Sequence, residues 1–495
     1  MSELRALKSG TDIRGVASTV SGRDITLTDA AVFRIVCGFA DYIKQQTNGA
    51  LRVAVGHDCR ISAERIKKQV IAALHSKGIS AFDCGLSSTP AMFMTTVLAD
   101  MSAAVQITAS HHPSDRNGLK FFLPSGGLNS TTLDTILDLA EQNAFVPAAE
   151  PVAEPLAFMD TYCAHLRQII CRGLQKQENE QPLAGFHIVV DAGNGAGGFY
   201  AEKVLQPLGA DTSGSVFLEP DGMFPNHIPN PENAAAMASI SNAVKASRAD
   251  FGVIFDTDVD RAACVDQTGS SINRNRLIAL AAAIVLENEP GSTIVTDSVT
   301  SDGLKAFITA LGGRHHRFKR GYKNVIDEAQ RLCAEGENAP LAIETSGHAA
   351  LKENYFLDDG AYLVTKIIIR LAALRAAGKT LDSLTDSLQT PAEEKEIRFA
   401  ITEADFKGYG QKVLQALTQF AGQNPEWKIA DDNYEGVRVS TAEGFFLLRM
   451  SVHDPIMPFN VESNAPGGVD TMLRALLPFF SACDGLDLSP LSHLQ

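Results

Sequence analysis

LRVAVGHD (residues 51–58) and the following SAERIKKQVIAALHSKG (62–78) decide the fold class. The first segment is mostly apolar and predicts a buried strand. The second predicts an amphipathic helix that ends at Gly78. Its apolar residues recur at helical spacing: Ile66, Val70, Ile71 and Leu74. ISAFDCG and SAAVQITAS predict two more strands, and this alternation of strands and helices is typical of a parallel or mixed sheet covered by helices.

The same alternation restarts further along the chain. New strand candidates open FHIVVDAGNGAGG (186–198), DFGVIFDTDVDR (250–261) and GSTIVTDSVTSDGLKAFITALGG (291–313). From about Thr390, EEKEIRFAIT, EGVRVSTAEGFFLLRMSV and GVDTMLRALLPFFSAC predict a smaller α+β unit. A length of 495 residues predicts three or four domains. With a first boundary in the polar QKQENEQP (175–182), we expect four domains, at 1–175, 183–288, 289–390 and 391–495.

The composition excludes several classes of protein. Lys and Arg number 43 against 58 Asp and Glu, a formal charge of −15, so binding to nucleic acid or to an anionic membrane is not expected. The longest apolar run, Leu277 to Leu286, is too short to span a membrane. We see no secretory signal in MSELRALKSG and no C-x-x-C pair among eight cysteines, so we expect a cytoplasmic protein with free thiols.

Polar clusters follow several of the predicted strands, where open α/β sheets bind their ligands. In VQITASHHPSDRNGLKFF (105–122), Ser110 could attack phosphorus. His111, His112 and Lys120 are candidates for proton transfer and charge support. The alternative is that Ser110 caps a helix and that the two histidines lie on the surface.

The segment Asp256-Thr-Asp258-Val-Asp260-Arg261 places three carboxylates at alternate positions. Three such charges could converge on one cation, and hard oxygen ligands favour Mg²⁺. Arg261 could then contact a substrate oxygen. The alternative is a solvated acidic turn.

Two more clusters suit a phosphorylated sugar. Glu344 and Ser346 can bind vicinal hydroxyls, and His348 can contact a hydroxyl or a phosphate; a helix cap explains them equally well. Arg449, Ser451 and His453 alternate, so an extended chain would present all three on one side, as a phosphate clamp requires. The alternative is the solvent face of an edge strand.

Gly193 to Gly198 fit G-x-G-x-x-G, and Glu219 lies at about the distance that a dinucleotide site requires. We favour a tight strand-to-helix turn, in which glycine is needed for positive φ or close packing. A nicotinamide-dependent oxidoreductase stays open as an alternative.

Taken in order, these clusters resemble the motifs of the α-D-phosphohexomutases, the phosphoglucomutase/phosphomannomutase family. The resemblance covers nearly the whole chain. It rests on GTDIRG (10–15), TASHHP (108–113) with the NGLKF that follows, DTDVDR, ETSGH and RMSVHDP. These are similar to the family's arginine segment, phosphoserine loop, metal loop, sugar loop and phosphate loop.

The resemblance implies a fold of four domains around a central cleft: three mixed α/β domains with similar βαβ units, and a smaller C-terminal α+β domain. It implies an enzyme that interconverts hexose 1-phosphate and hexose 6-phosphate, of glucose or mannose. The reaction would pass through phosphorylated Ser110 and a hexose 1,6-bisphosphate, which is also the expected activator.

The resemblance also assigns residues. It implies that Mg²⁺ lies between the Ser110 phosphate and Asp256, Asp258 and Asp260. Arg14 and Lys120 would join the reaction centre, Lys120 as general acid/base with His111 nearby, and Arg261 would support the transferring group. Sugar hydroxyls would be held by Glu344 and Ser346 with His348 beside them, and the second phosphate by Arg449 and Ser451, next to His453.

The sequence departs from the family pattern at several positions. Thr257 and Val259 replace glycines of the metal loop, and a β-branched residue disfavours positive φ, so we expect a different backbone there. His112, Ile343 and His453-Asp454 are also unusual. These changes leave open a mutase for N-acetylglucosamine or glucosamine phosphate, and an inactive homologue that binds a sugar phosphate.

Overall fold

The computed structural model describes residues 2–47, 49–146, 152–451 and 454–494. They form two compact units, each built from two stretches of chain. The first unit comprises Met1–Leu277 and Ser346–Ser383, and the second comprises Ile278–Thr345 and Leu384–Gln495. The chain therefore leaves the first unit and returns to it before the second is complete.

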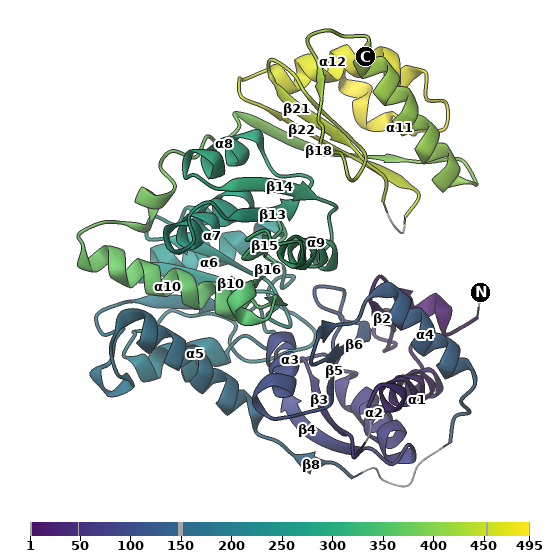
Figure 1. Ribbon diagram of the computed structural model, residues 1–495, viewed down its shortest axis with the longest axis vertical. Helices are drawn as coiled ribbons and strands as arrows, with labels where there is room; N and C mark the ends of the chain where they lie inside the picture. The colour runs from purple at the N-terminus through teal and green to yellow at the C-terminus, as the bar shows by residue number, and fades with distance from the viewer. Residues whose placement is uncertain (1, 48, 147–151, 452–453, 495) are drawn as a thin grey trace. The chain divides into compact units, whose positions relative to one another are not determined.

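The N-terminal sheet of the first unit is mixed (Figure 1). β3 (Arg52–His57) is parallel to β4 (Ser80–Leu86) and β5 (Ala103–Ile107), and β6 (Arg116–Leu123) runs antiparallel to β5. These strands confirm the three strands expected at the start of the chain. The order of strands is β1 (Lys8–Ser9), β2 (Asp12–Val16), β6, β5, β3, β4 and β8 (Glu154–Pro155), with β7 (Gly126–Gly127) beside β6.

Helices cover both faces of this sheet. α1 (Asp29–Gln46), α2 (Ala63–Ser76) and α4 (Ser130–Glu141) lie on one face, and α3 (Thr89–Leu98) lies on the other (Figure 1). α2 is the expected amphipathic helix, and its apolar residues enter the core. Gly38 allows α1 to cross α4, because a Cβ there would come within 2.4 Å of the Ile136 carbonyl oxygen.

The second sheet of the first unit carries the acidic segment. β9 (Ile188–Asp191) is parallel to β10 (Phe251–Phe255), which pairs antiparallel with β11 (Ala262–Asp266), and β12 (Ser271–Ile272) follows at the edge. α6 (Ala234–Ser247) packs on this sheet through Ile240 and Val244. The first unit also contains α5 (Phe158–Leu174), the antiparallel pair β16 (Ala349–Leu351) and β17 (Leu357–Asp358), and α10 (Gly360–Ala376).

The helix expected after the glycines of 193–198 takes a different form. The structure has a π-helical segment, η3 (Tyr200–Leu205), and then a 3₁₀ turn, η4 (Gln206–Leu208). Pro207 lies in the 3₁₀ turn and has no backbone N–H to donate to the preceding turn. Tyr200 is nevertheless fixed, because its hydroxyl lies 2.9 Å from Thr365 Oγ1 on α10.

The second unit holds two sheets. In one, β14 (Arg314–Phe318), β13 (Thr293–Asp297) and β15 (Leu341–Ile343) are parallel. The other is antiparallel throughout and carries helices on one face, which confirms the α+β unit expected at the C-terminus (Figure 1). Its strands are β18 (Glu393–Ala400), β22 (Ile456–Ser463), β21 (Gly444–Leu448), β20 (Val437–Ser440) and β19 (Lys428–Ile429), and its helices are α11 (Phe406–Gly422) and α12 (Gly468–Ser481).

Charged side chains join these two sheets. Asp302, at the start of α8 (Asp302–Ala310), accepts hydrogen bonds of 2.8 Å from both Arg317 on β14 and Arg438 on β20. α9 (Tyr322–Ala334) completes this part, and α7 (Arg274–Asn288) contains the point at which the chain first passes between the units. Short helical turns complete the described elements: η1 (Arg5–Leu7), η2 (Glu178–Glu180), η5 (Lys352–Asn354), η6 (Leu381–Leu384) and η7 (Ser489–Leu494).

The expected fold class is thus confirmed: three α/β sheets are followed by a smaller α+β part at the C-terminus. The exact domain boundaries and the central cleft stay predictions. All eight cysteines are unpaired, as expected. Within the described ranges, no helix combines the length and the apolar character needed to cross a membrane.

Candidate active site

Ser110 lies in the loop between β5 and β6, immediately beyond the carboxyl end of β5. The side chain is 3% exposed, and its backbone has a left-handed φ of 50°. Its N–H donates to Thr108 Oγ1 at 2.9 Å, and this hydroxyl in turn donates to the buried Asp58 at 2.7 Å. Because a strand follows the loop, Ser110 is not a helix cap.

The three predicted carboxylates follow β10 and converge. Asp256, Asp258 and Asp260 are buried, and one carboxylate oxygen from each lies within 4.8 Å of the others. The segment is therefore not a solvated turn. Burial and the neighbouring Asp260 raise the pKa of Asp256 well above its usual range. Burial alone would also raise the pKa of Asp260, but Lys120, His348 and Arg261 hold it well below its usual range.

This carboxylate cluster fits a divalent cation. Oδ1 of Asp258 and Oδ1 of Asp260 are buried and accept no hydrogen bond within the described part of the chain. Such oxygens are costly to bury unless a cation or a donor meets them. Mg²⁺ prefers oxygen ligands, and this cluster offers three carboxylates. The assignment of a cation site rests on these three side chains alone.

The loop from Asp256 to Arg261 has, at Val259, a backbone conformation typical of glycine, although the sequence has no glycine there. Val259 has a φ of 67° and is completely buried. Our expectation of a different backbone was therefore wrong at this position. Its carbonyl accepts a hydrogen bond of 3.0 Å from Gly360 N, and a Cβ on Gly360 would lie 2.7 Å from the carbonyl carbon of Arg261. The packing around the loop overrides the local preference of a β-branched residue.

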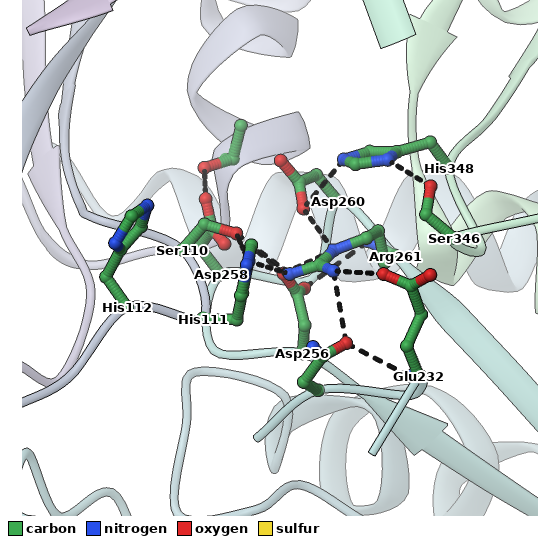
Figure 2. Close-up of polar contacts among 12 residues, drawn as sticks. Ser110, His111, His112, Glu232, Asp256, Asp258, Asp260, Arg261, Ser346 and His348 are labelled. Atoms are coloured by element: carbon green, nitrogen blue, oxygen red, sulfur yellow. Dashed lines mark hydrogen bonds and ion pairs between the residues drawn. The ribbon is translucent and has the colours of Figure 1, made fainter. Parts of the chain in front are cut away.

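Two cations face these carboxylates. Lys120, on β6, contacts Asp260 and lies 3.3 Å from Asp258. Arg261 is 1% exposed, and its Nη2 lies 3.0 Å from Ser110 Oγ and 2.9 Å from Asp256 Oδ2 (Figure 2). The Ser110 hydroxyl itself donates to Asp256 at 3.1 Å. The predicted nucleophile, acidic loop and cations thus form one cluster.

Arg14 lies beside the Ser110 loop. Its guanidinium donates to the Ala109 carbonyl at 3.3 Å and pairs with Asp12 at 2.9 Å. The side chain is thus placed one residue from Ser110, although it comes from β2.

Of the two histidines next to Ser110, His111 is exposed and His112 is partly exposed, so the surface position considered for them holds for His111. His111 Nδ1 lies 3.3 Å from Ser110 Oγ and 2.6 Å from Arg261 Nη2. Desolvation and then Arg261 lower the pKa of His111 to about 2. Burial and then Arg14 lower the pKa of His112 to about 3. A neutral imidazole beside Arg261 accepts a hydrogen bond and adds no charge.

Two of the predicted sugar-loop residues lie in the same cluster. Ser346 Oγ is 2.9 Å from His348 Nδ1, and His348 Nε2 is 3.7 Å from Asp260 (Figure 2). Glu344, two residues earlier in the sequence, belongs to the second unit. Its Oε1 accepts a 2.6 Å hydrogen bond from Gly321 N. Burial and then Glu344 raise the pKa of the neighbouring Asp297 to about 6.

The predicted phosphate clamp lies in the second unit. Arg449 follows β21, which is paired on both sides, so it does not lie on an edge strand. Its Nη1 is 3.3 Å from Glu435, whose second oxygen accepts hydrogen bonds from Ser298 Oγ at 2.9 Å and from Arg320 N at 2.7 Å. Ser451 Oγ accepts a hydrogen bond from Asp454 N, and His453 lies outside the described residues.

Sequence reasoning missed several residues that surround these clusters. Arg60 and Asp58 underlie the Ser110 loop, Thr89 donates to Asp258, and Asn230 accepts from Arg261 Nη1 at 3.1 Å. Asp58 and Arg60 could have been found, because they follow β3 at the same edge of the sheet as Ser110. Asn230 and Glu435 could not be found in this way, because both lie in loops and neither directly follows a predicted strand.

The glycines of 193–198 serve close packing. A Cβ on Gly195 would lie 2.7 Å from the Thr257 carbonyl oxygen, and Ala196 N donates to that oxygen at 2.8 Å. This tight turn therefore supports the metal loop directly, as the favoured interpretation of the motif requires.

Comparison with known proteins now identifies the family. Models described as phosphoglucomutase/phosphomannomutase alpha/beta/alpha domains I, II and III match residues 6–146, 160–269 and 273–391. A phosphoglucomutase of Neisseria gonorrhoeae is 30% identical over 465 residues, 93% of both chains. The chain belongs to the α-D-phosphohexomutase family.

Other relatives agree with this α-D-phosphohexomutase assignment. A phosphomannomutase/phosphoglucomutase of Pseudomonas aeruginosa is 30% identical, and the match covers 92% of this chain and 90% of that protein. A crystal structure of a phosphoglucomutase/phosphomannomutase family protein from Burkholderia thailandensis superposes with a TM-score of 0.80 at 24% identity, covering 98% of this chain and 99% of that one. Mutases of this family are intramolecular phosphotransferases.

Proposed function

We propose that this protein interconverts hexose 1-phosphate and hexose 6-phosphate through phosphorylated Ser110. The observation that carries the proposal is the convergence on Ser110 Oγ of Arg261 at 3.0 Å and Asp256 at 3.1 Å, with Lys120 within the same carboxylate cluster. Phosphoryl transfer has a loose transition state, so an enzyme contributes mainly position and positive charge. The residues of this cluster supply both the position and the positive charge.

In the proposed reaction, a free hydroxyl of the substrate attacks the phosphorus on Ser110. The new oxygen–phosphorus bond forms as the bond to Ser110 Oγ breaks, and the hydroxyl proton goes to Lys120 Nζ. Lys120 pairs with Asp258 and Asp260 as a cation in the structure, so it has to release its own proton before it acts as this base. Arg261 neutralises charge on the transferring group, and the neutral His111 keeps Arg261 aimed at it. The resulting hexose 1,6-bisphosphate then returns its other phosphoryl group to Ser110 Oγ.

Asp256, Asp258 and Asp260 would hold a Mg²⁺ ion. When bound, this ion supplies positive charge to the phosphate on Ser110. The two buried carboxylate oxygens that accept no hydrogen bond in the described chain support this assignment.

For the second phosphate of the substrate we propose Arg449 with Ser451, and for sugar hydroxyls Glu344, Ser346 and His348. A clamp that holds the phosphate that is not being transferred binds in the same way whichever carbon carries that phosphate. Substrate orientation can therefore reverse between the two half-reactions. Arg449 and Glu344 are both buried.

Intact-mass analysis tests the proposal directly. Incubation with glucose 1,6-bisphosphate should add the mass of one phosphoryl group to the protein, and Ser110→Ala should prevent the addition. Absence of the heavier species in active protein would contradict the proposal. A panel of the 1-phosphates of glucose, mannose, N-acetylglucosamine and glucosamine then identifies the sugar. Turnover of none of them would favour an inactive homologue.

A further inference from the structure

Arg60 lies beneath the loop that carries Ser110. Its guanidinium is fully buried and donates only to backbone carbonyls of that loop among the contacts described. Nη1 donates to Pro113 at 2.7 Å and to Arg116 at 2.9 Å, and Nη2 donates to His112 at 2.6 Å and to Ser110. One side chain therefore fixes four carbonyls within seven consecutive residues.

Asp58 completes the attachment from the other side of Ser110. It lies 3.3 Å from Arg60 Nε and accepts the Thr108 hydroxyl, which in turn accepts the Ser110 N–H. The N–H and the carbonyl of Ser110 are thus both tied to the Asp58–Arg60 pair. Arg261 and Asp256 contact only the hydroxyl of Ser110, so this pair acts on the backbone and not on the reacting oxygen.

Gly222 and Phe224, in the segment that precedes α6, pack against Cys59 and Arg60. The ring of Phe224 lies 5.3 Å from the Arg60 guanidinium. Gly222 packs so closely that a Cβ would lie 2.5 Å from the Cys59 carbonyl oxygen. Water is thereby kept from the guanidinium, and hydrogen bonds to a buried charge are strong.

Ser110 needs such support because its left-handed φ of 50° is unfavourable for a residue other than glycine. We propose that Arg60 is a positioning residue: it holds the Ser110 backbone in this conformation, so that Oγ faces Arg261, and it thereby sets the rate of phosphoryl transfer to and from Ser110. The inference rests on the proposed role of Ser110 as phosphoryl carrier. The planar guanidinium group of Arg60 reaches four carbonyls, and the single ammonium group of a lysine cannot do the same.

The test compares Arg60→Lys with Arg65→Lys. Arg65, on α2, is a matched control because it also donates to two carbonyls, those of Ala17 and Leu27 at 3.0 Å, and pairs with Asp29. Phosphorylation by glucose 1,6-bisphosphate is followed by intact mass in a single turnover, well below the unfolding temperature of each variant. Arg60→Lys should be slowed by about tenfold or more, since small misplacement of a reacting group costs this much. Arg65→Lys should retain the wild-type rate.

Steady-state kinetics add a second readout. Arg60→Lys should lower kcat and leave KM for the sugar phosphate unchanged, because the hydrogen bonds of Arg60 go to backbone carbonyls and to none of the residues proposed to bind the substrate. A wild-type rate in Arg60→Lys would overturn the inference, as would equal slowing in both variants. If Arg60→Lys does not fold, the same two measurements are made on Asp58→Asn, with the same results expected. This substitution removes the ion pair with Arg60 and keeps an acceptor for the Thr108 hydroxyl. Failure of the wild type to be phosphorylated would instead reject the proposed function.

Discussion

Arg261 Nη2 lies 3.0 Å from Ser110 Oγ, although 151 residues separate the two in the chain. The loop after β5 and the loop after β10 meet at this contact. Both residues are almost completely buried, so their attraction is weakly screened by water. The contact brings a hydroxyl and a permanent positive charge together where a phosphoryl group would be transferred.

Ser110→Ala should abolish mutase activity, because no other side chain in the described cluster offers a hydroxyl to both Arg261 and Asp256. We expect less than about one per cent of the wild-type kcat, a loss typical of removing a covalent nucleophile. A coupled assay with glucose 6-phosphate dehydrogenase measures it. Ser62→Ala is the control, since Ser62 is also buried in the first domain and accepts a hydrogen bond from Asn117. Substantial activity in Ser110→Ala would remove the nucleophile from the mechanism.

Asp258→Asn should change stability in opposite directions with and without metal. In EDTA the variant should unfold at a higher temperature, because it removes one of three buried carboxylates that converge and repel one another. With Mg²⁺ at about a hundred times its dissociation constant, the wild type should gain about 2.7 kcal/mol and the variant much less. Thermal unfolding with and without Mg²⁺ measures both effects. A wild type that ignores Mg²⁺ would argue against a metal site.

Arg449→Lys should weaken binding of the sugar phosphate more than it slows turnover. Losing charge-assisted hydrogen bonds costs about 1.5–3 kcal/mol, which corresponds to a rise in KM of about ten- to a hundredfold. Initial rates at varied glucose 1-phosphate measure the change. Arg398→Lys, on β18 with an exposed side chain, is the control. An unchanged KM in Arg449→Lys would exclude this arginine from the clamp.

Asp359 should make the stability of the first unit depend on pH. Burial raises its pKa to about 6, although Tyr162 and the N-terminus of α10 donate hydrogen bonds to it. The folded protein therefore holds this proton more tightly than the unfolded chain, whose carboxyl titrates near its ordinary value. This contribution is complete below that value and is lost as the pH rises through about 6.

Asp359→Asn removes this titration. The stability of the variant relative to the wild type should therefore rise by on the order of 3 kcal/mol between pH 4 and pH 7. Urea unfolding of both proteins across this range measures the difference. A constant difference would show that the pKa of Asp359 is the same in the folded and unfolded states.

Much of the fold could be predicted because its signals are local. The apolar strand at 51–58 and the helical spacing of Ile66, Val70 and Leu74 require only neighbouring residues to be recognised. The cluster around Ser110 was predictable in part, because Ser110 and Asp256 each follow a strand, where open α/β sheets bind their ligands. The two strands belong to different sheets, so the contact between the two loops does not follow from the local sequence.

Other features depend on contacts between distant segments and could not be predicted. Val259 keeps a left-handed φ because Gly360, a hundred residues later, packs on its loop. The contact of Glu435 with Ser298 and Arg320 has no counterpart in the local sequence, since the three residues come from three loops. The short π-helix Tyr200–Leu205 lies where a helix was expected, and its Tyr200 contacts Thr365, 165 residues later in the chain.

The hydrogen bonds from the Tyr162 hydroxyl to Asp359, each 2.7 Å, bear on how the protein is made. When the ribosome has translated the first 277 residues, α10 has not yet been synthesised. Tyr162 and Tyr200 are buried against this helix in the folded protein. Domains generally fold as units while the chain emerges. The first unit therefore cannot complete its packing around these two side chains until residues 346–383 have left the exit tunnel.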